Sequence, residues 1–196
     1  MENLLNSILS RIDDNSLQAI GQQANASPTQ AKSALASAIP ILMNALAKNS
    51  STPDGAQSLQ NALARDHDGS LLDNLGSLLQ NPDSANGAGI LKHVLGNKRQ
   101  NVEKYISQDS GLSGGSAGKI LEIAAPILMG YLGKKNATGS NNVIGNLLNS
   151  YVKAEKKQAP QAQSIINQLL DRDNDGSIMD DIAEMGMSFL GKMKKR

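Results

Sequence analysis

The strongest constraint on the fold of this chain is a stretch of twelve residues that occurs twice. The segment "LASAIPILMNAL" (35–46) aligns with "LEIAAPILMGYL" (121–132) at a spacing of 86 residues, and seven of the twelve positions are identical. At the same spacing, "IGQQANAS" (20–27) matches "ISQDSGLS" (106–113). A match that extends over two separate segments at one spacing predicts two diverged copies of the same structural unit.

Each copy has the apolar spacing of a helix. In both segments apolar residues recur three and four positions apart, which places them on one face of a helix. These residues are Leu35, Ala38, Ile39, Leu42, Met43 and Leu46 in the first copy, and Leu121, Ala124, Ala125, Leu128, Met129 and Leu132 in the second. No segment shows the two-residue alternation of a strand. The chain has only three Tyr, one Phe and no Trp, so its core must come from aliphatic side chains, which suits close-packed helices.

A proline lies inside each of the two stripes. Pro40 and Pro126 lack a backbone N–H, which frees the carbonyls of Ala36 and Glu122. We therefore expect a kink or a helix restart at both positions. By contrast, Ser27 followed by Pro28 is typical of an N-cap and the first residue of a helix.

The duplication also predicts how the chain is divided. Two acidic segments match at a spacing of 107 residues, where Arg65-Asp66 falls on Arg172-Asp173. The second copy is thus longer by 21 residues, which we assign to an extra helix inserted near 141–160. The turn-rich segment "QNPDSANGAG" (80–89) is the expected seam. We predict a first helical repeat over 1–85 and a second over 86–196.

Several of these segments together resemble a bacterial family of uncharacterised proteins, domain-of-unknown-function family 937, which includes the YidB-like proteins. They are "GILKHVLGNKRQNVEKYISQDSGLS", "AAPILMGYLGKK" and the two "RDxDGSxxDD/N" segments. The resemblance implies an all-helical fold with a homeodomain-like arrangement in part of it. It implies no activity.

The C-terminal acidic segment is similar to a calcium-binding loop. In such a loop, oxygen ligands stand at positions 1, 3, 5 and 7, with glycine at 6 and a bidentate acid at 12. Position 12 is Ile182 here, so an acid at position 10 or 11 must close the shell. The candidate metal ligands are Asp171, Asp173, Asp175, Ser177, Asp180 and Asp181. Without the bidentate acid we expect a weak site, with a dissociation constant of ~0.1 to 1 mM.

The first acidic segment has fewer carboxylates, because Ala64 stands at position 1. Its candidate ligands are Asp66, Asp68 and Asp73. Both segments also fit a capping box, in which Ser70 and Asp73 (Ser177 and Asp180 in the second copy) close the start of a helix. Arg65 and Arg172 are close enough in sequence to supply a counter-charge. The two interpretations are compatible, and both stay open.

The segments "IGQQANASPTQAKSAL" and "ISQDSGLSGGSAGKIL" have the spacing of a helix-turn-helix. Recognition of DNA needs basic and amide side chains on the second helix. The candidates are Gln30 and Lys32 in the first copy and Lys119 in the second. The formal net charge is only +1, which provides no general attraction to nucleic acid, so this is the weaker hypothesis.

Other classes of function find little support. The chain has no cysteine, which excludes disulfides and thiolate metal sites, and His67 and His93 have no paired ligand spacing. The segment "SGGSAGKI" (113–120) lacks the first glycine and the magnesium-binding hydroxyl of a phosphate-binding loop, so we expect only a helix-opening turn there. No run approaches the ~18 apolar residues of a membrane span. We expect a cytoplasmic, non-enzymatic interaction or structural protein with an unknown protein partner. A nucleic-acid-associated protein is the alternative.

Overall fold

The computed structural model describes residues 4–138 and 143–171, and these residues form helices without a strand. The predicted all-α class is therefore confirmed for this part of the chain. The α-helices are α1 (Leu4–Leu9), α2 (Asp14–Ala24), α3 (Pro28–Asn49), α4 (Pro53–Arg65), α5 (Ser70–Asp73), α6 (Leu75–Gln80), α7 (Gly87–Val94), α8 (Arg99–Ser110), α9 (Gly114–Ala137), α10 (Val143–Gln158) and α11 (Pro160–Asp171). The short 3₁₀ helices η1 (Pro82–Ala85) and η2 (Gly96–Lys98) flank α7.

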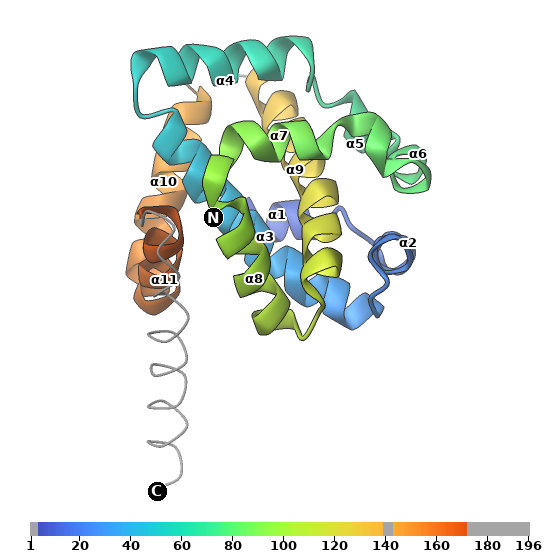
Figure 1. Ribbon diagram of the computed structural model, residues 1–196. Helices are drawn as coiled ribbons and strands as arrows, with labels where there is room; N and C mark the ends of the chain where they lie inside the picture. Colours follow the sequence, from blue (N-terminus) through green and yellow to red (C-terminus); the bar gives the residue numbers. More distant parts are fainter. Residues whose placement is uncertain (1–3, 139–142, 172–196) are drawn as a thin grey trace, which may run out of the picture.

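The two long helices α3 and α9 form the centre of the molecule and contact each other (Figure 1). They carry the two apolar stripes, and every residue of both stripes is buried. The exposed fraction of Leu35 and of Leu121 is 0%. Thus the feature that is duplicated in the sequence is also the core of the fold.

Local sequence explains where the two long helices begin. The hydroxyl of Ser27 accepts a hydrogen bond from the backbone N–H of Gln30, whose side chain accepts from the Ser27 backbone N–H in return. At the equivalent position, the hydroxyl of Ser113 accepts from the backbone N–H of Ser116. The preceding helices, α2 and α8, each end at a residue in the left-handed region, Asn25 (φ 51°) and Gly111 (φ 65°). Both residue types tolerate that conformation.

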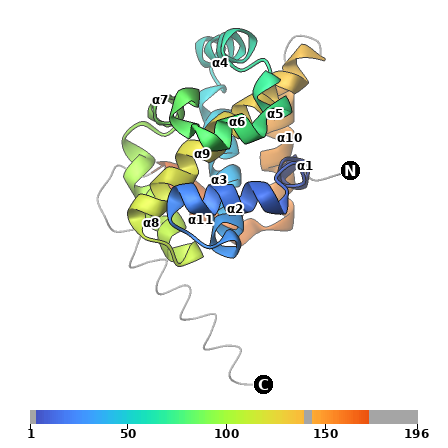
Figure 2. The ribbon, with the colours of Figure 1, turned by 90° about the vertical axis from the view of Figure 1, so that its right-hand side faces the viewer.

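The remaining helices surround this centre (Figures 1 and 2). Helix α2 contacts both α3 and α9, and α8 likewise contacts both α9 and α3. Helix α1 packs on α3, while α7 packs on α9. Helix α4 contacts α9, while α10 and α11 contact each other and both contact α3.

The prolines do not interrupt the central helices. Pro40 lies inside α3 and Pro126 inside α9, and each helix runs through its proline as one element. Of the two predicted outcomes the restart is therefore wrong, while the kink stays a prediction. The carbonyl of Glu122, which Pro126 leaves without its usual partner, lies against Gly87 at the start of α7, where a Cβ atom would lie 1.9 Å from the Glu122 oxygen. None of the described helices is both long and apolar enough to cross a bilayer.

Candidate functional site

The first acidic loop connects α4 to α5. Asp66 is the C-cap residue that follows α4, and it is exposed. Gly69 turns the chain with a φ of 99°, a conformation that favours glycine. One carboxylate oxygen of Asp68 accepts a hydrogen bond of 2.9 Å from the backbone N–H of Ser70. That N–H and the Ser70 hydroxyl hold the pKa of Asp68 below its usual value. The carboxylate of Asp68 thus stabilises the turn between α4 and α5.

The capping box predicted for this loop is wrong. Ser70 is the first residue of α5 rather than its cap, and no side chain caps that helix. The carboxylate of Asp73 instead lies 2.6 Å from the ammonium group of Lys134, on α9. Thus Lys134, which is distant in the sequence, supplies the counter-charge of Asp73. The local pattern did not indicate it because the pair forms only when α5 packs on α9.

The structure tests little of the predicted metal sites. Among the described residues, no three His, Asp or Glu side chains lie close enough together to hold a metal ion, so Asp66, Asp68 and Asp73 are not gathered into one group. In the second loop, Asp171 is the last residue of α11. Asp173, Asp175, Ser177, Asp180 and Asp181 lie outside the described residues. Calcium binding by the second loop therefore stays a prediction.

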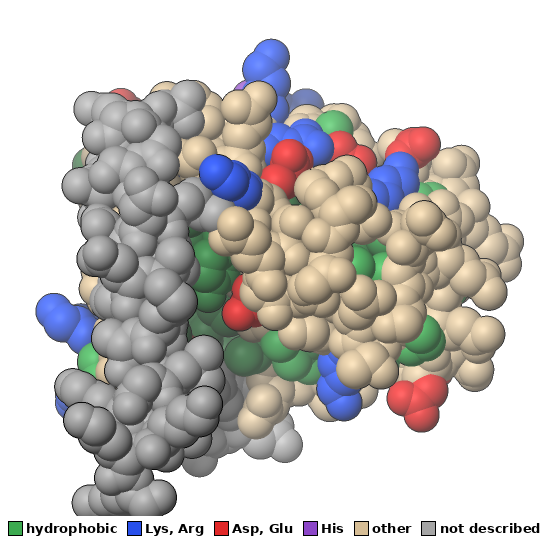
Figure 3. All heavy atoms as spheres, turned by 60° about the horizontal axis from the view of Figure 1, so that its bottom comes forward, with side chains coloured by type: hydrophobic (Ala, Val, Ile, Leu, Met, Phe, Trp, Pro, Cys, Tyr) green, Lys and Arg blue, Asp and Glu red, His purple; other side chains and the backbone are tan. Residues whose placement is uncertain are grey.

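The side chains proposed to read DNA are mostly engaged in other contacts. The side-chain N–H of Gln30 donates to the backbone carbonyl of Gly111 at 2.8 Å, while Lys32 is exposed. The ammonium group of Lys119 lies 2.6 Å from the carboxylate of Asp83. On the face seen in Figure 3, Lys and Arg side chains are scattered among Asp and Glu side chains and do not gather into one basic patch.

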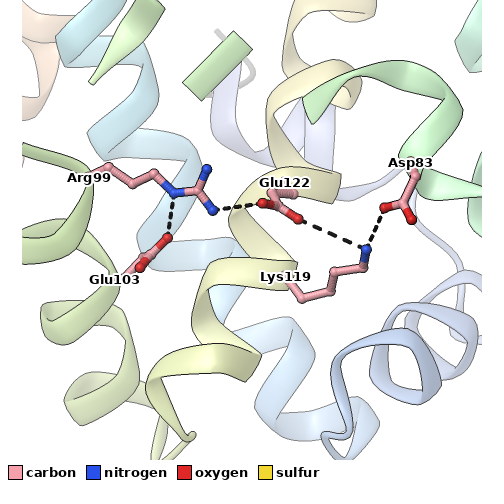
Figure 4. A network of polar contacts seen from close by, with 5 residues as sticks. All are labelled: Asp83, Arg99, Glu103, Lys119 and Glu122. Carbon is pink, nitrogen blue, oxygen red and sulfur yellow. Dashed lines mark hydrogen bonds and ion pairs between the residues drawn. The ribbon is translucent and has the colours of Figure 1, made fainter. Parts of the chain in front are cut away.

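Lys119 belongs to a chain of ion pairs that joins η1, α8 and α9 (Figure 4). The guanidinium of Arg99 lies 2.6 Å from the carboxylate of Glu103 and 2.7 Å from that of Glu122. The other oxygen of Glu122 is 3.9 Å from Lys119, which also pairs with Asp83. Asp83 is largely exposed, and the other four side chains are only partly exposed. Because the charges alternate in sign, the network joins three elements and presents little net charge.

A shallow trough lies between α2 and the α5–α6 pair. It has a volume of about 720 Å³. A second hollow near Ile144 has about 30 Å³, room for little more than a water molecule. The residues that line the trough are Arg11, Asp13, Asn15, Ser16, Ala19, Gln22, Gln23, Leu72, Asp73, Leu75, Gly76, Leu79 and Gln80. Sequence reasoning missed this site, because even the nearest lining residues of its two walls, Gln23 and Leu72, are 49 positions apart in the chain.

The trough combines apolar and uncharged polar side chains. Ala19, Leu72 and Leu75 are half-buried, and the side chain of Gln23 donates a hydrogen bond of 3.0 Å to the Leu79 carbonyl. The charged residues at its rim are already engaged. Arg11 lies over the Tyr131 ring at 5.8 Å, and Asp13 caps α2 by accepting from Ser16. This arrangement suits the binding of an uncharged surface.

Neither of the two histidines is among the residues that line the trough. His67 is half-buried in the first acidic loop, and burial lowers its pKa below the usual value. His93 is exposed near the end of α7, where its backbone carbonyl accepts from the Asn49 side chain. The segment 113–120 opens α9, as the sequence predicted.

Comparison with known proteins gives a family and no activity. A family described as "Bacterial protein of unknown function (DUF937)" matches residues 6–135, which extend from α1 to near the end of α9. No curated protein and no solved structure matches the chain.

Proposed function

Since the chain belongs to this bacterial family of unknown function, we propose from its own residues that it is a non-enzymatic interaction protein that holds a partner helix in the trough between α2 and α5–α6. The observation that carries the proposal is the trough itself, with its half-buried leucines and its amide-lined walls. A groove with helices on both sides and apolar side chains among its lining is an arrangement in which proteins receive an amphipathic helix.

We also propose that the fold consists of two diverged copies of one helical unit, with helix-turn-helix-like packing. Helices α2 and α3 correspond in sequence to α8 and α9 at the spacing of 86 residues. The left-handed residues Asn25 and Gly111, and the capping residues Ser27 and Ser113, are separated by that same spacing. The reciprocal contacts of α2 with α9 and of α8 with α3 support the same view. In this scheme α4 corresponds to α11, both of which begin at a proline, and α10 is the inserted helix.

The chemistry of the trough defines the partner. Because Arg11, Asp13 and Asp73 are engaged within the chain, the groups that remain to contact a partner are apolar or amide side chains such as Leu75, Gln22 and Gln80. We therefore expect a helix with small apolar residues on one face and uncharged polar residues beside them. Its affinity should depend only weakly on salt, unlike that of a nucleic acid.

The test uses helical peptides selected from a displayed library against the purified chain. Replacing Ala19 by glutamate places an unpaired charge in the trough, and we expect the affinity of selected peptides to fall by more than about tenfold, which corresponds to about 1.4 kcal/mol. The control is Ala154→Glu, which places the same charge on the exposed face of α10 and should leave the affinity unchanged. Binding is measured by fluorescence anisotropy of labelled peptides.

Two results would contradict the proposal. One is equal affinity of the selected peptides for the Ala19→Glu variant and for the parent. The other is the absence of peptide binding together with strongly salt-dependent binding of duplex DNA, which would favour the nucleic-acid alternative with Gln30, Lys32 and Lys119 as the groups to replace first.

The predicted calcium site in the second acidic loop is a separate part of the proposal. Asp171, Asp173 and Asp175 would supply side-chain oxygens, and a site without the bidentate acid should be weak. At a hundredfold excess of calcium over its dissociation constant, binding stabilises the fold by about 2.7 kcal/mol. We expect the melting temperature to rise in ~10 mM calcium, about tenfold above the weakest dissociation constant expected, relative to chelator. The rise should vanish in Asp173→Ala. If the parent shows no rise, the site does not exist.

A further inference from the structure

The three ionisable residues that line the trough lie together at one of its ends. The guanidinium of Arg11 lies 5.8 Å from the centre of the Tyr131 ring, and the carboxylate of Asp73 lies 2.6 Å from the ammonium group of Lys134. Because Tyr131 and Lys134 are about one helical turn apart on α9, Arg11 and Asp73 are brought to the same place. Asp13, the N-cap of α2, follows Arg11 by two residues. These three residues form the charged end of the trough.

The opposite end of the trough is formed by amide side chains. The side chain of Gln23, in the last turn of α2, donates a hydrogen bond of 3.0 Å to the carbonyl of Leu79, in the last turn of α6. Gln22 and Gln80 are the chain neighbours of these two residues, and both are exposed. Gln22, Gln23 and Gln80 form the amide end. Helix α2 and the α5–α6 pair thus run in the same direction, from the charged end to the amide end (Figure 2).

Helix α2 itself presents a face of the kind that the trough is expected to bind. Ala19 stands in the middle of this face, with Ser16 and Gln22 three positions away on either side. Ser16 and Ala19 have small side chains and are half-buried, so another helix can approach α2 closely. On the opposite wall, Gly76 is open on the side where a Cβ atom would lie. The partner helix that the chemistry of the trough defines therefore has a counterpart within this chain.

A two-fold axis perpendicular to α2 brings these features together in complementary order. Such an axis reverses the helix, so α2 of one copy enters the trough of the other in the antiparallel direction. The charged end of each trough then faces the amide end of its partner, and no like charges meet. Amide groups both donate and accept hydrogen bonds, which makes them suitable neighbours for charges of either sign. A parallel arrangement would instead place Arg11 against Arg11 and Asp13 against Asp13, which is unfavourable.

We propose that the occupant of the trough is α2 of a second copy of this chain, in a symmetric dimer whose two-fold axis passes near Ala19. The inference rests on the proposed function of the trough and names its partner. Dimers of this symmetry are the commonest assemblies of identical chains, and they need only one self-complementary surface. In the dimer the partner's α2 covers Leu72 and Leu75, which are half-buried in the single chain, and this removal of apolar surface from water favours association.

Sedimentation equilibrium of the full chain tests the dimer at total concentrations up to ~1 mM, where a dissociation constant of ~0.1 mM leaves most of the chain dimeric. We expect the average mass to rise from 20.6 kDa towards twice that value. Ala19→Glu places two unpaired carboxylates at the axis, so the dissociation constant should rise by more than about tenfold. The control is Ala154→Glu, on the exposed face of α10, which should leave the dissociation constant unchanged.

A single introduced cysteine locates the axis, because the chain contains no cysteine of its own. Under mild oxidation Ala19→Cys should form an intermolecular disulfide, since the axis brings the two copies of this residue close together. Ala154→Cys, away from the axis, should form it much more slowly. The amplitude of the helical circular dichroism signal verifies that each variant is folded.

Three results would overturn the inference. The mass of the parent could stay at 20.6 kDa over the whole range of concentrations, Ala19→Glu could dimerise as strongly as the parent, or the two cysteine variants could cross-link at the same rate. A monomeric parent whose selected peptides still lose affinity with Ala19→Glu would refute the second copy and retain the trough as a site for another protein. If those peptides also bind the Ala19→Glu variant equally well, the proposed function is wrong too.

Discussion

Replacing Leu35 or Leu121 by alanine should lower the free energy of unfolding by about 2–5 kcal/mol in each case, the largest effect that we expect from a single substitution in this chain. Both side chains are fully buried at equivalent points of α3 and α9. The loss combines the transfer of apolar surface with the cost of the cavity that remains. Because the proposed repeat places the two leucines in matching surroundings, their losses should agree within about 1 kcal/mol, well inside the spread seen among unlike sites.

Urea unfolding followed by circular dichroism measures both losses, and an unchanged slope of the transition shows that the comparison is valid. Leu75→Ala is the control, since this leucine is half-buried at the trough and should cost clearly less. If replacing one of the two core leucines by alanine lowers the free energy of unfolding by less than about 1 kcal/mol, the packing around that leucine is looser than around the other. The equivalence of the two central helices would then be wrong.

Gly133→Ala should lower the free energy of unfolding by about 1–3 kcal/mol, although the same change within an ordinary helix raises it by as much as ~1 kcal/mol. A Cβ atom at Gly133 would lie 1.5 Å from the carbonyl oxygen of His67 and 2.7 Å from the carbon of that carbonyl. Both belong to the backbone of the first acidic loop, which cannot yield as a flexible side chain does. The substitution must displace the loop from α9, and with it the pairing of Asp73 with Lys134.

The matched control is Gly145→Ala, in α10, where no atom lies within 4 Å of the position that the new Cβ would take. This substitution should be neutral or stabilising, by up to ~1 kcal/mol. The opposite signs of the two changes in the free energy of unfolding are the expected result, and melting curves or urea unfolding report both. A Gly133→Ala variant as stable as the Gly145→Ala variant would show that the loop does not press against α9.

Much of the fold could be predicted from local sequence, because helix formation depends on neighbours in the chain. The spacing of apolar residues located α3 and α9, and Ser27 with Pro28 marked the start of α3. The apolar spacing of the segment near 141–160 predicted a helix where α10 lies. The sequence showed where each proline lies, but it did not show whether the helix continues through it. Each central helix continues through its proline, which the loss of one backbone hydrogen bond alone does not decide.

The candidate sites depended more on the tertiary structure. The sequence showed carboxylates in both acidic loops. It could not distinguish a metal ligand from a helix cap or an ion-pair partner, because a carboxylate group is suited to each of these three roles. In the first loop the distinction comes from α9, which places Lys134 beside Asp73 and Gly133 beside His67. The trough likewise depends on tertiary packing, because its leucines and its amides belong to segments that are separate in the sequence.

The sequence by itself thus determined the helices, their stripes and the resemblance between the two halves, all of which follow from spacings of a few residues or from direct alignment. Only the tertiary structure decided where the halves differ. The residues that correspond to Gly130 and Gly133 are Asn44 and Ala47, so α3 lacks the space that α9 offers to the first acidic loop. In α3, Asn44 instead binds Gln163 of α11. The physical reason is that an added Cβ atom or amide group hardly changes the stability of an isolated helix. Where the backbone of another segment must approach that helix closely, the same atoms decide whether the two can pack.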